Sequence, residues 1–236
     1  CIKTFLFITI KFFLLCAAPG SPHNNRSDIK MVKKHWWAAA VAGLALVAGH
    51  AQADQLAEIQ KKGQLVVGVL GTDEPNSFID AQTRELVGYD VDLGRVVAAK
   101  LGVKPVFKQI TVAARIPELQ QGHVDLVAAS LTHTKEREAQ IDFSLTTLVT
   151  GQTVLVKKSS GIKDVPDLAG KRVVTVKGGN QESNIRKVVP TATVVTFDTG
   201  PQAFLALQQG KGVGFVNDAI SVVRAQGQLG AKAADY

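Results

Sequence analysis

The chain has 236 residues, enough for one or two domains, and its composition of 46% hydrophobic and 20% charged residues excludes wholesale disorder. The formal net charge of +7 is uneven, because residues 1–53 carry +5 and the other 183 residues carry only +2, from 21 basic against 19 acidic side chains. The bulk of the chain lacks the basic excess of a nucleic-acid-binding protein, so we expect no nucleic-acid partner.

The stretch from Met31, the only methionine, has the pattern of a secretory signal peptide. Two lysines are followed by an apolar run from Trp36 to Gly49 and by the small-x-small sequence Ala51-Gln52-Ala53. The run is shorter than the ~20 residues that a membrane-spanning helix needs. We therefore expect residues 31–53 to be a signal peptide, cleaved before Asp54, and the mature protein to be periplasmic.

Residues 1–30 begin with Cys1 and contain no methionine, and we interpret them as an extension upstream of the natural start. The alternative is a second apolar anchor from Phe5 to Ala18, interrupted by Lys11.

From Asp54 onward, short β-rich runs alternate with helical stretches. The predicted strands are Leu65 to Leu70, Lys104 to Ile110, Val124 to Ala129, Gln152 to Lys157, Arg172 to Val176, Ala192 to Phe197 and Val213 to Val216. The predicted helices are Asp90 to Leu101, Arg115 to Gln121, Asn180 to Val188 and Gln202 to Gln209. This alternation predicts α/β layers around parallel sheets, in which ligands bind beyond the carboxyl ends of the strands.

An internal repeat supports two similar α/β lobes. The sequence Leu-Gln-Gln-Gly occurs at 119–122 and again at 207–210, each time before a buried strand. Eight residues past each glycine stands a polar group, Ser130 in the first copy and Asp218 in the second. Both should lie at the carboxyl end of a strand, where a ligand between two lobes would be held. Chance is the alternative, because four-residue matches containing glutamine are common.

Two loops near the first strand hold polar residues. In the turn-rich stretch from Asp73 to Asp80, Phe78 is a lone apolar ring, which would cover the aliphatic part of a ligand or pack beneath its own loop. In the next loop Asp90 is placed to cap the following helix, and Asp92 to interact with its positive end.

The stretch from Ser130 to Arg137 is the strongest candidate anion site. Two hydroxyls, Ser130 and Thr132, leave a strand and precede a short helix that carries Arg137. A guanidinium can grip a carboxylate with two parallel hydrogen bonds. From the residues alone, however, the favoured reading of Arg137 is a surface salt bridge to Glu136 or Glu138.

A second anion-friendly loop joins a predicted strand to a predicted helix. Gly178 and Gly179 offer bare backbone N–H groups, and Asn180 and Gln181 offer amides at a helix N-terminus. The loop lacks the remaining glycine and the Lys-Ser/Thr of a phosphate-binding loop, so no nucleotide is expected.

Metal, cofactor and nucleophile chemistry have little support beyond Asp54. Both cysteines lie at positions 1 and 16, and the two histidines of the remaining chain, His123 and His133, have no ligand spacing. No G-x-S-x-G elbow occurs. We expect no catalytic residue, no metal and no cofactor.

Taken together, the motifs from about Asp54 to Tyr236 resemble the extracytoplasmic solute-binding proteins of polar amino-acid ABC importers, which have the periplasmic-binding-protein type II fold. The motifs that carry the resemblance are Gly-Val-Leu at 68–70, Ser77-Phe78-Ile79-Asp80, Val-Gly-Tyr-Asp-Val-Asp-Leu at 87–93, Arg115-Ile116-Pro117 with Leu119 and Gly122, Ser130 and Thr132 with Arg137, Asp142-Phe143-Ser144, Asp167-Leu168 with Gly170-Lys171, and Phe215 with Asp218.

The resemblance implies roles for individual residues. Arg137 would clasp the α-carboxylate of an amino acid, helped by Ser130 and Thr132, and Asp218 would hold the α-ammonium from the other lobe. The loop of Gly178, Asn180 and Gln181 would add contacts, although Asn180 stands where the family commonly has threonine. This reverses the surface reading of Arg137.

Arg115 resembles an arginine of the glutamate/aspartate-binding branch, where it lies close to the acidic ligand. That branch also carries an arginine soon after the first strand, and residues 70–72 offer none here. The resemblance therefore leaves an acidic preference open.

The implied partners are a small amino acid and an ABC importer permease in the inner membrane, with a monomeric binding protein that closes two lobes, residues 54–148 and 149–236, around its ligand. An enzyme on the same fold, similar to cyclohexadienyl dehydratases, is the alternative, with Glu74 as its candidate acid. A sensor module is a third possibility. We also expect the chain to be truncated, without the return to the first lobe after Tyr236.

Overall fold

The computed structural model describes residues 55–236. The upstream extension at 1–30 and the signal peptide at 31–53 that the sequence predicts lie outside these residues. Among the described residues, no helix is both long enough and apolar enough to cross a membrane.

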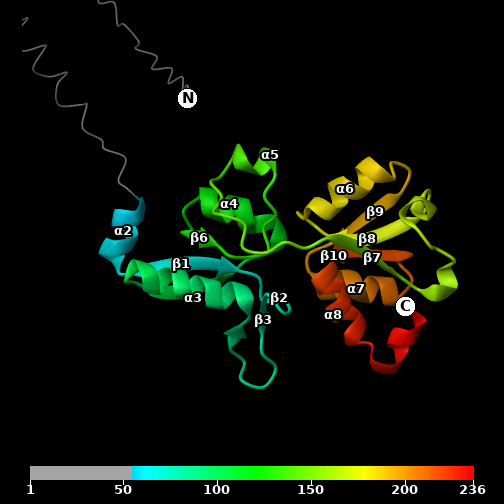
Figure 1. Ribbon diagram of the computed structural model, residues 1–236, viewed down its shortest axis with the longest axis horizontal. Helices are drawn as coiled ribbons and strands as arrows, with labels where there is room; N and C mark the ends of the chain where they lie inside the picture. The colour runs from blue at the N-terminus through cyan, green and yellow to red at the C-terminus, as the bar shows by residue number, and fades with distance from the viewer. Residues whose placement is uncertain (1–54) are drawn as a thin grey trace, which may run out of the picture. The chain divides into compact units, whose positions relative to one another are not determined.

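The first sheet has three parallel strands in the order β5-β1-β6. They are β1 (Gln64–Val69), β5 (Lys104–Gln109) and β6 (Leu126–Val127). The central strand, β1, contains Val67 and Val69, which are fully buried, as expected of a strand covered on both faces. Helices α2 (Gln55–Lys62) and α3 (Tyr89–Leu101) lie along this sheet (Figure 1), and α3 contributes Val91 and Ala98 to its core.

A small antiparallel sheet follows β1. Its strands are β2 (Thr72–Asp73), β3 (Ser77–Ile79) and β4 (Leu86–Val87), in the order β2-β3-β4. The sequence did not predict these strands, because runs of two or three residues are too short to show an alternating pattern. This sheet places Asp73 just beyond the carboxyl end of β1.

The rest of the first half consists of short elements. They are η1 (Val112–Ala114), α4 (Arg115–Gln120) and α5 (Lys135–Glu138). The side chain of Thr134 accepts a hydrogen bond from the backbone of Arg137 and so caps α5.

The second sheet has four strands in the order β7-β10-β8-β9. They are β7 (Gln152–Val156), β8 (Arg172–Val176), β9 (Thr193–Phe197) and β10 (Gly214–Asp218). β10, β8 and β9 are parallel, but β7 runs antiparallel to β10, with Gln152 opposite Asp218. The expectation of wholly parallel sheets is therefore wrong for β7. The chain arrives from the first half at the carboxyl edge of β10, so β7 must run in the opposite direction.

Helices cover both faces of the second sheet (Figure 1). Helix α6 (Asn180–Val188) packs on one face, and α7 (Gly200–Gln208) and α8 (Ala219–Gly227) pack on the other. On the α7 face, the rings of Phe204 and Phe215 pack in a tilted arrangement at a centroid distance of 5.9 Å. The short helices η2 (Lys158–Ser160), η3 (Val165–Leu168) and η4 (Gly230–Asp235) complete the second half.

All seven predicted strands are present, and the internal repeat is structural. The first Leu-Gln-Gln-Gly sequence ends α4 and the second ends α7, and the glycines, Gly122 and Gly210, have φ values of +69° and +73°. Each glycine adopts the left-handed conformation that terminates a helix. The repeat therefore marks equivalent helix–strand units in the two halves.

Candidate functional site

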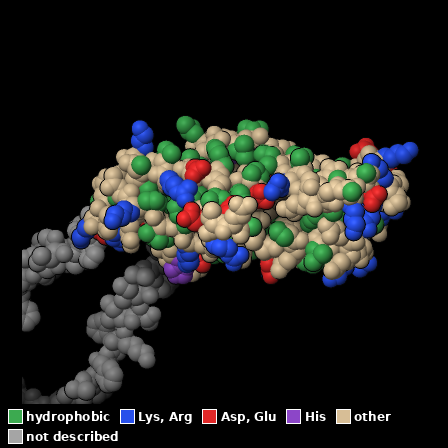
Figure 2. Space-filling model, turned by 90° about the horizontal axis from the view of Figure 1, so that it is seen from below, with side chains coloured by type: hydrophobic (Ala, Val, Ile, Leu, Met, Phe, Trp, Pro, Cys, Tyr) green, Lys and Arg blue, Asp and Glu red, His purple; other side chains and the backbone are tan. Residues whose placement is uncertain are grey.

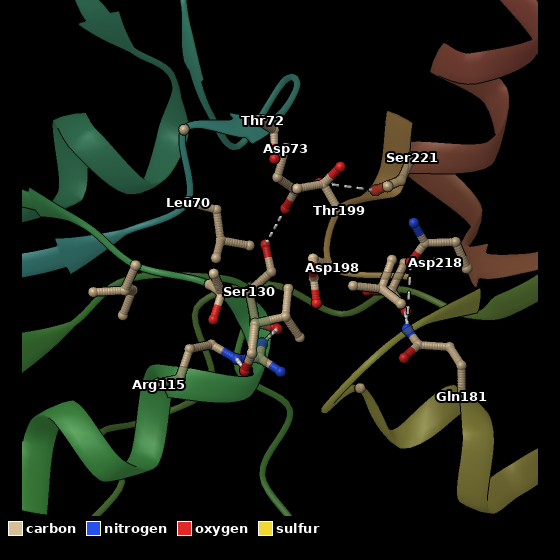
Figure 3. A pocket seen from close by; sticks show the side chains of 18 of the residues that line it. Leu70, Thr72, Asp73, Arg115, Ser130, Gln181, Asp198, Thr199, Asp218 and Ser221 are labelled. Carbon is tan, nitrogen blue, oxygen red and sulfur yellow. Dashed lines mark hydrogen bonds between the residues drawn. The ribbon is translucent and has the colours of Figure 1, made fainter. Parts of the chain in front are cut away.

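A cavity of about 270 Å³ lies beyond the carboxyl ends of strands from both sheets (Figure 3). Its size suits a small molecule, since ligand pockets begin near ~300 Å³. The residues that line it are Leu70, Gly71, Thr72, Asp73, Gln109, Ile110, Thr111, Val112, Arg115, Ser130, Thr132, Val176, Gly179, Asn180, Gln181, Asp198, Thr199, Gly200, Asn217, Asp218 and Ser221.

Six of the nine residues proposed from the sequence line this cavity: Arg115, Ser130, Thr132, Asn180, Gln181 and Asp218. Phe78, Arg137 and Gly178 do not line it. Phe78 is half-buried in β3, where it pairs with Thr72 and Val87.

Asp73 is the most heavily hydrogen-bonded carboxylate of the cavity wall. Its Oδ2 accepts hydrogen bonds from the hydroxyl of Ser130 at 2.7 Å and from the amide of Asn76 at 3.1 Å. Its Oδ1 accepts one from the hydroxyl of Ser221 in α8 at 3.1 Å. Asp73 therefore connects the small antiparallel sheet to the second half of the chain.

Asp90 lies behind this carboxylate and is not a helix cap. Helix α3 begins after Gly88 without a side-chain cap, so the predicted capping role of Asp90 is wrong. Only 7% of Asp90 is exposed, and its Oδ2 lies 3.5 Å from the hydroxyl of Ser130. Burial, with the negative charge of Asp73 as the next cause, raises the pKa of Asp90 to about 6.

Ser130 holds an unusual backbone conformation, with a φ of +51°. Non-glycine residues rarely adopt such a value, because the Cβ atom crowds the backbone. Two interactions fix this conformation: the Ser130 carbonyl accepts a hydrogen bond from Arg115 at 2.9 Å, and its hydroxyl donates to Asp73.

Arg115 is buried, with 4% of its surface exposed, and its donors are turned mainly to backbone carbonyls. Nε donates to Val112 at 2.8 Å, Nη1 donates to Ala129 at 3.0 Å and to Ser130, and Nη2 donates to Gly178 at 3.2 Å. Burial, with the nearby charge of Arg137 as the next cause, lowers the pKa of Arg115 to about 10. Four of the five N–H donors of Arg115 are thus committed to the protein.

Arg137 is half-buried and forms no ion pair with Glu136 or Glu138, in contrast to the reading from the residues alone. Nη1 donates to the carbonyl of Thr132 at 2.8 Å, and Nη2 donates to the carbonyl of Gly178 at 3.1 Å. Burial lowers the pKa of Arg137. Two of its N–H donors are committed, so Arg137 keeps more free N–H groups than Arg115, although it lies outside the cavity lining.

Gly178 lies in close contact with residues of the first half. Its carbonyl accepts hydrogen bonds from both Arg115 and Arg137. Its φ is +81°, and a Cβ atom at this position would lie 2.5 Å from the Cα of Ala113. Only glycine satisfies both the backbone conformation and the close contact.

Asp218 lies on the opposite wall, at the end of β10. Its carboxylate accepts a hydrogen bond from the Gln181 amide at 3.1 Å. Burial, with the charge of Asp73 as the next cause, raises the pKa of Asp218, and the Gln181 bond opposes this rise. Nearby, the side-chain oxygen of Asn180 accepts a hydrogen bond from Gln152 at 2.9 Å.

Three helix N-termini meet at the cavity. Helices α6, α7 and α8 follow β8, β9 and β10, and their first residues or caps are among the lining residues. The positive ends of helix dipoles favour negative charge nearby.

The sequence analysis missed several lining residues, notably Asp73, Asp198 and Ser221. Asp73 and Asp198 could have been predicted, because each follows a predicted strand and ligands of α/β proteins bind beyond the carboxyl ends of the strands. Ser221 could not have been predicted, because it lies one turn into a helix and is 148 residues from its hydrogen-bond partner, Asp73.

Glu74, the candidate acid of an enzyme, does not line the cavity and forms an ion pair with Arg224. Within residues 55–236 no group of three or more metal-ligating side chains occurs. His123 pairs with Glu118 and His133 pairs with Glu138.

Comparisons with known proteins agree on one family. Residues 65–236 match the bacterial extracellular solute-binding proteins, family 3. The chain is 33% identical over 222 residues to the ABC transporter glutamine-binding protein GlnH of Bacillus subtilis (strain 168), covering 92% of this chain and 74% of that protein. It is 32% identical over 200 residues to the glutamate/aspartate import solute-binding protein of Escherichia coli (strain K12), covering 77% of this chain and 66% of that protein. The chain thus spans about two thirds to three quarters of the length of these relatives.

A solved structure gives the same fold. The crystal structure of an ancestral amino acid-binding protein, a precursor of cyclohexadienyl dehydratase, superposes with a TM-score of 0.70 at 34% identity, covering 78% of this chain and 80% of that one.

Proposed function

Because the chain belongs to the bacterial extracellular solute-binding proteins, family 3, we propose that it binds a polar L-amino acid in the periplasm and delivers it to the permease of an ABC importer. The similarity to amino-acid-binding proteins of ABC transporters supports this role. An exported binding protein also agrees with the secretory pattern of residues 31–53.

The observation that carries the proposal is the separation of opposite charges across the cavity. Arg115 lines one side of the cavity and shares the Gly178 carbonyl with Arg137, which lies just outside the lining, and Asp218 lines the other side. An amino acid presents an anionic and a cationic group at the same carbon atom. Burying either charge is costly unless it is paired, so a cavity with both signs favours a zwitterion over a simple acid or amine.

We assign the α-carboxylate to Arg137 with Thr132 and Ser130, and the α-ammonium to Asp218. Arg137 suits the carboxylate because it keeps free donors, whereas Arg115 is largely committed to backbone carbonyls. Arg115 then acts mainly by holding the loop around Ser130. Gln181 positions the Asp218 carboxylate.

The mechanism is closure of two lobes, which we assign to residues 54–148 and 149–236. The carbonyl of Gly178 and the hydroxyl of Ser221 contact the first half only when the two halves are together. A ligand that touches both walls favours this closed arrangement, because only here are both of its charges paired.

Calorimetry of the protein with each of the twenty amino acids tests the proposal. We expect at least one polar L-amino acid to bind, and Arg137→Ala to lose about 2–5 kcal/mol of its binding free energy, the range for removing one partner of a buried charge pair. Arg137→Lys should recover only part, since lysine lacks the bidentate geometry. Arg186→Ala is the matched control, because Arg186 lies in an exposed pair on α6. If Arg137→Ala binds every amino acid as well as the parent protein does, the assignment is wrong.

The rival function is an enzyme of the dehydratase type, which needs a general acid in the cavity. Glu74, the acid proposed from the sequence for such an enzyme, forms an ion pair with Arg224 outside the lining and is therefore not placed to act as that acid. Recovery of the bound amino acid unchanged after prolonged incubation would agree with binding, and a dehydrated product would refute it.

A further inference from the structure

We propose that Asp198, in the turn between β9 and α7, selects ligands whose side chain ends in a cation, so that the amino acid bound is of the lysine and arginine class. This inference rests on the proposed function, because it concerns the side-chain end of the same cavity.

The charges of the lining are unbalanced. Three carboxylates, Asp73, Asp198 and Asp218, line the cavity, and Arg115 is its one lining cation among the described residues. Four of the five N–H donors of Arg115 are already hydrogen-bonded to backbone carbonyls. The wall therefore offers a ligand more free negative charge than free positive charge.

The three carboxylates differ in how far the protein already satisfies them. Asp73 accepts three hydrogen bonds. Asp218 accepts one from Gln181 and is assigned to the α-ammonium. Asp198 accepts no hydrogen bond and forms no ion pair with any residue between 55 and 236. In the view of Figure 3 it is drawn between Ser130 and Asp218, with no dashed line to it.

Asp198 lies next to the N-terminus of α7. It directly precedes Thr199, which caps α7 and accepts a hydrogen bond from the backbone of Gln202. A carboxylate beside a helix N-terminus is stabilised by the helix dipole. Asp198 is exposed in the present arrangement, so water solvates it until a ligand covers it.

A bound ligand that buries the Asp198 carboxylate must compensate its charge, and this requirement determines the class of ligand. A carboxylate that loses its water needs a donor or a cation, or its burial is costly. A ligand with an acidic side chain would add a further negative charge beside Asp73 and Asp198. A ligand with an ammonium or guanidinium end would instead neutralise Asp198 and supply several donors.

Calorimetry with lysine, arginine, glutamine and glutamate tests this inference. We expect lysine or arginine to bind about tenfold or more tightly than glutamine, and glutamate to bind most weakly. Asp198→Asn should weaken lysine or arginine by about tenfold or more while changing glutamine by less than about threefold. Asp142→Asn is the matched control, because Asp142 is an exposed aspartate outside the cavity. Asp198→Lys should reverse the order and favour glutamate.

The outcomes separate this inference from the function it rests on. If glutamine or glutamate binds as tightly as lysine and arginine, or if Asp198→Asn weakens all ligands equally, the inference is wrong while amino-acid binding stands. If none of the twenty amino acids binds to the parent protein, the proposed function itself fails.

Discussion

The hydroxyl of Ser221 donates a hydrogen bond to Oδ1 of Asp73 at 3.1 Å, across 148 residues of sequence. One turn further along α8, Arg224 forms an ion pair with Glu74, the residue next to Asp73. Two successive residues of the first half are thus held by one face of one helix. These contacts tie α8 to the β2–β3 turn at the edge of the cavity.

Ser221→Ala should weaken ligand binding moderately. The substitution removes one donor from Asp73, which keeps its bonds from Ser130 and Asn76. We expect a loss of about 0.5–1.5 kcal/mol in the binding free energy, the usual worth of one hydrogen bond. Calorimetry measures it, and Ser159→Ala, at an exposed serine in η2, should bind like the parent protein. Unchanged affinity in Ser221→Ala would show that this contact does not stabilise the bound form.

Gly178→Ala should abolish tight closure. The new methyl group would collide with the backbone of Ala113, and overpacking of this kind costs about 1–3 kcal/mol. Gly161→Ala is a stringent control, because Gly161 has a φ of +71° and nothing within 4 Å of its Cβ position. In both variants the alanine must adopt an unfavourable positive φ, but only Gly178→Ala should lose ligand affinity. Equal affinities in the two variants would contradict the close approach of the loops.

Arg115→Ala should lower stability more than any exposed arginine substitution. It leaves the carbonyls of Val112, Ala129 and Ser130 without their arginine donor, so we expect the free energy of unfolding to fall by roughly 2–5 kcal/mol. Denaturant titration checks this value, with Arg186→Ala as the exposed control. Arg115→Lys should not rescue stability, because a single ammonium cannot reach carbonyls that lie on different sides. Full rescue by lysine would show that the charge matters and the fork geometry does not.

Asp90 should make stability fall as pH rises from about 4 to about 6. Its pKa is about 6 in the folded chain and ~3.9 in the unfolded chain, so in this window the folded state binds more protons. The stabilisation by this proton is complete below pH ~4 and is lost through pH ~6, at a cost of roughly 2–4 kcal/mol.

Asp90→Asn, which imitates the protonated carboxyl, should remove this dependence. Its free energy of unfolding, relative to the parent protein, should rise between pH 4 and 7. Asp92→Asn, in the exposed first turn of the same helix, should leave the pH profile unchanged. Parallel profiles for Asp90→Asn and the parent protein would contradict the buried ionisation.

Residue patterns predicted the helices and strands well, because secondary structure depends largely on residues that are neighbours in the sequence. The span Asn180–Val188 was predicted as a helix from its spacing and Arg172–Val176 as a strand from its β-branched run, and both bounds agree with the structure. The repeat predicted that Ser130 and Asp218 stand at equivalent strand ends, and both line one cavity.

The environment of individual side chains was harder to predict. Asp90 fits the helix-cap pattern in sequence, but the approach of Asp73 and Ser130, which sequence spacing does not reveal, makes it a buried carboxylate. Arg137 has acidic neighbours in sequence, but its donors turn to carbonyls on two loops. The direction in which a side chain points depends on tertiary packing, which a pattern of residue types does not encode.

The backbone conformation of Ser130 implies that thermal stability and ligand binding favour different residues at this position. A glycine at this position would adopt the φ of +51° freely, so Ser130→Gly should relieve backbone strain of about 1–3 kcal/mol. The same change would delete the hydroxyl that holds Asp73 and lines the cavity. A laboratory selection for heat resistance alone would therefore enrich glycine here and lose affinity, whereas a selection that also rewards uptake of the amino acid would retain the strained serine.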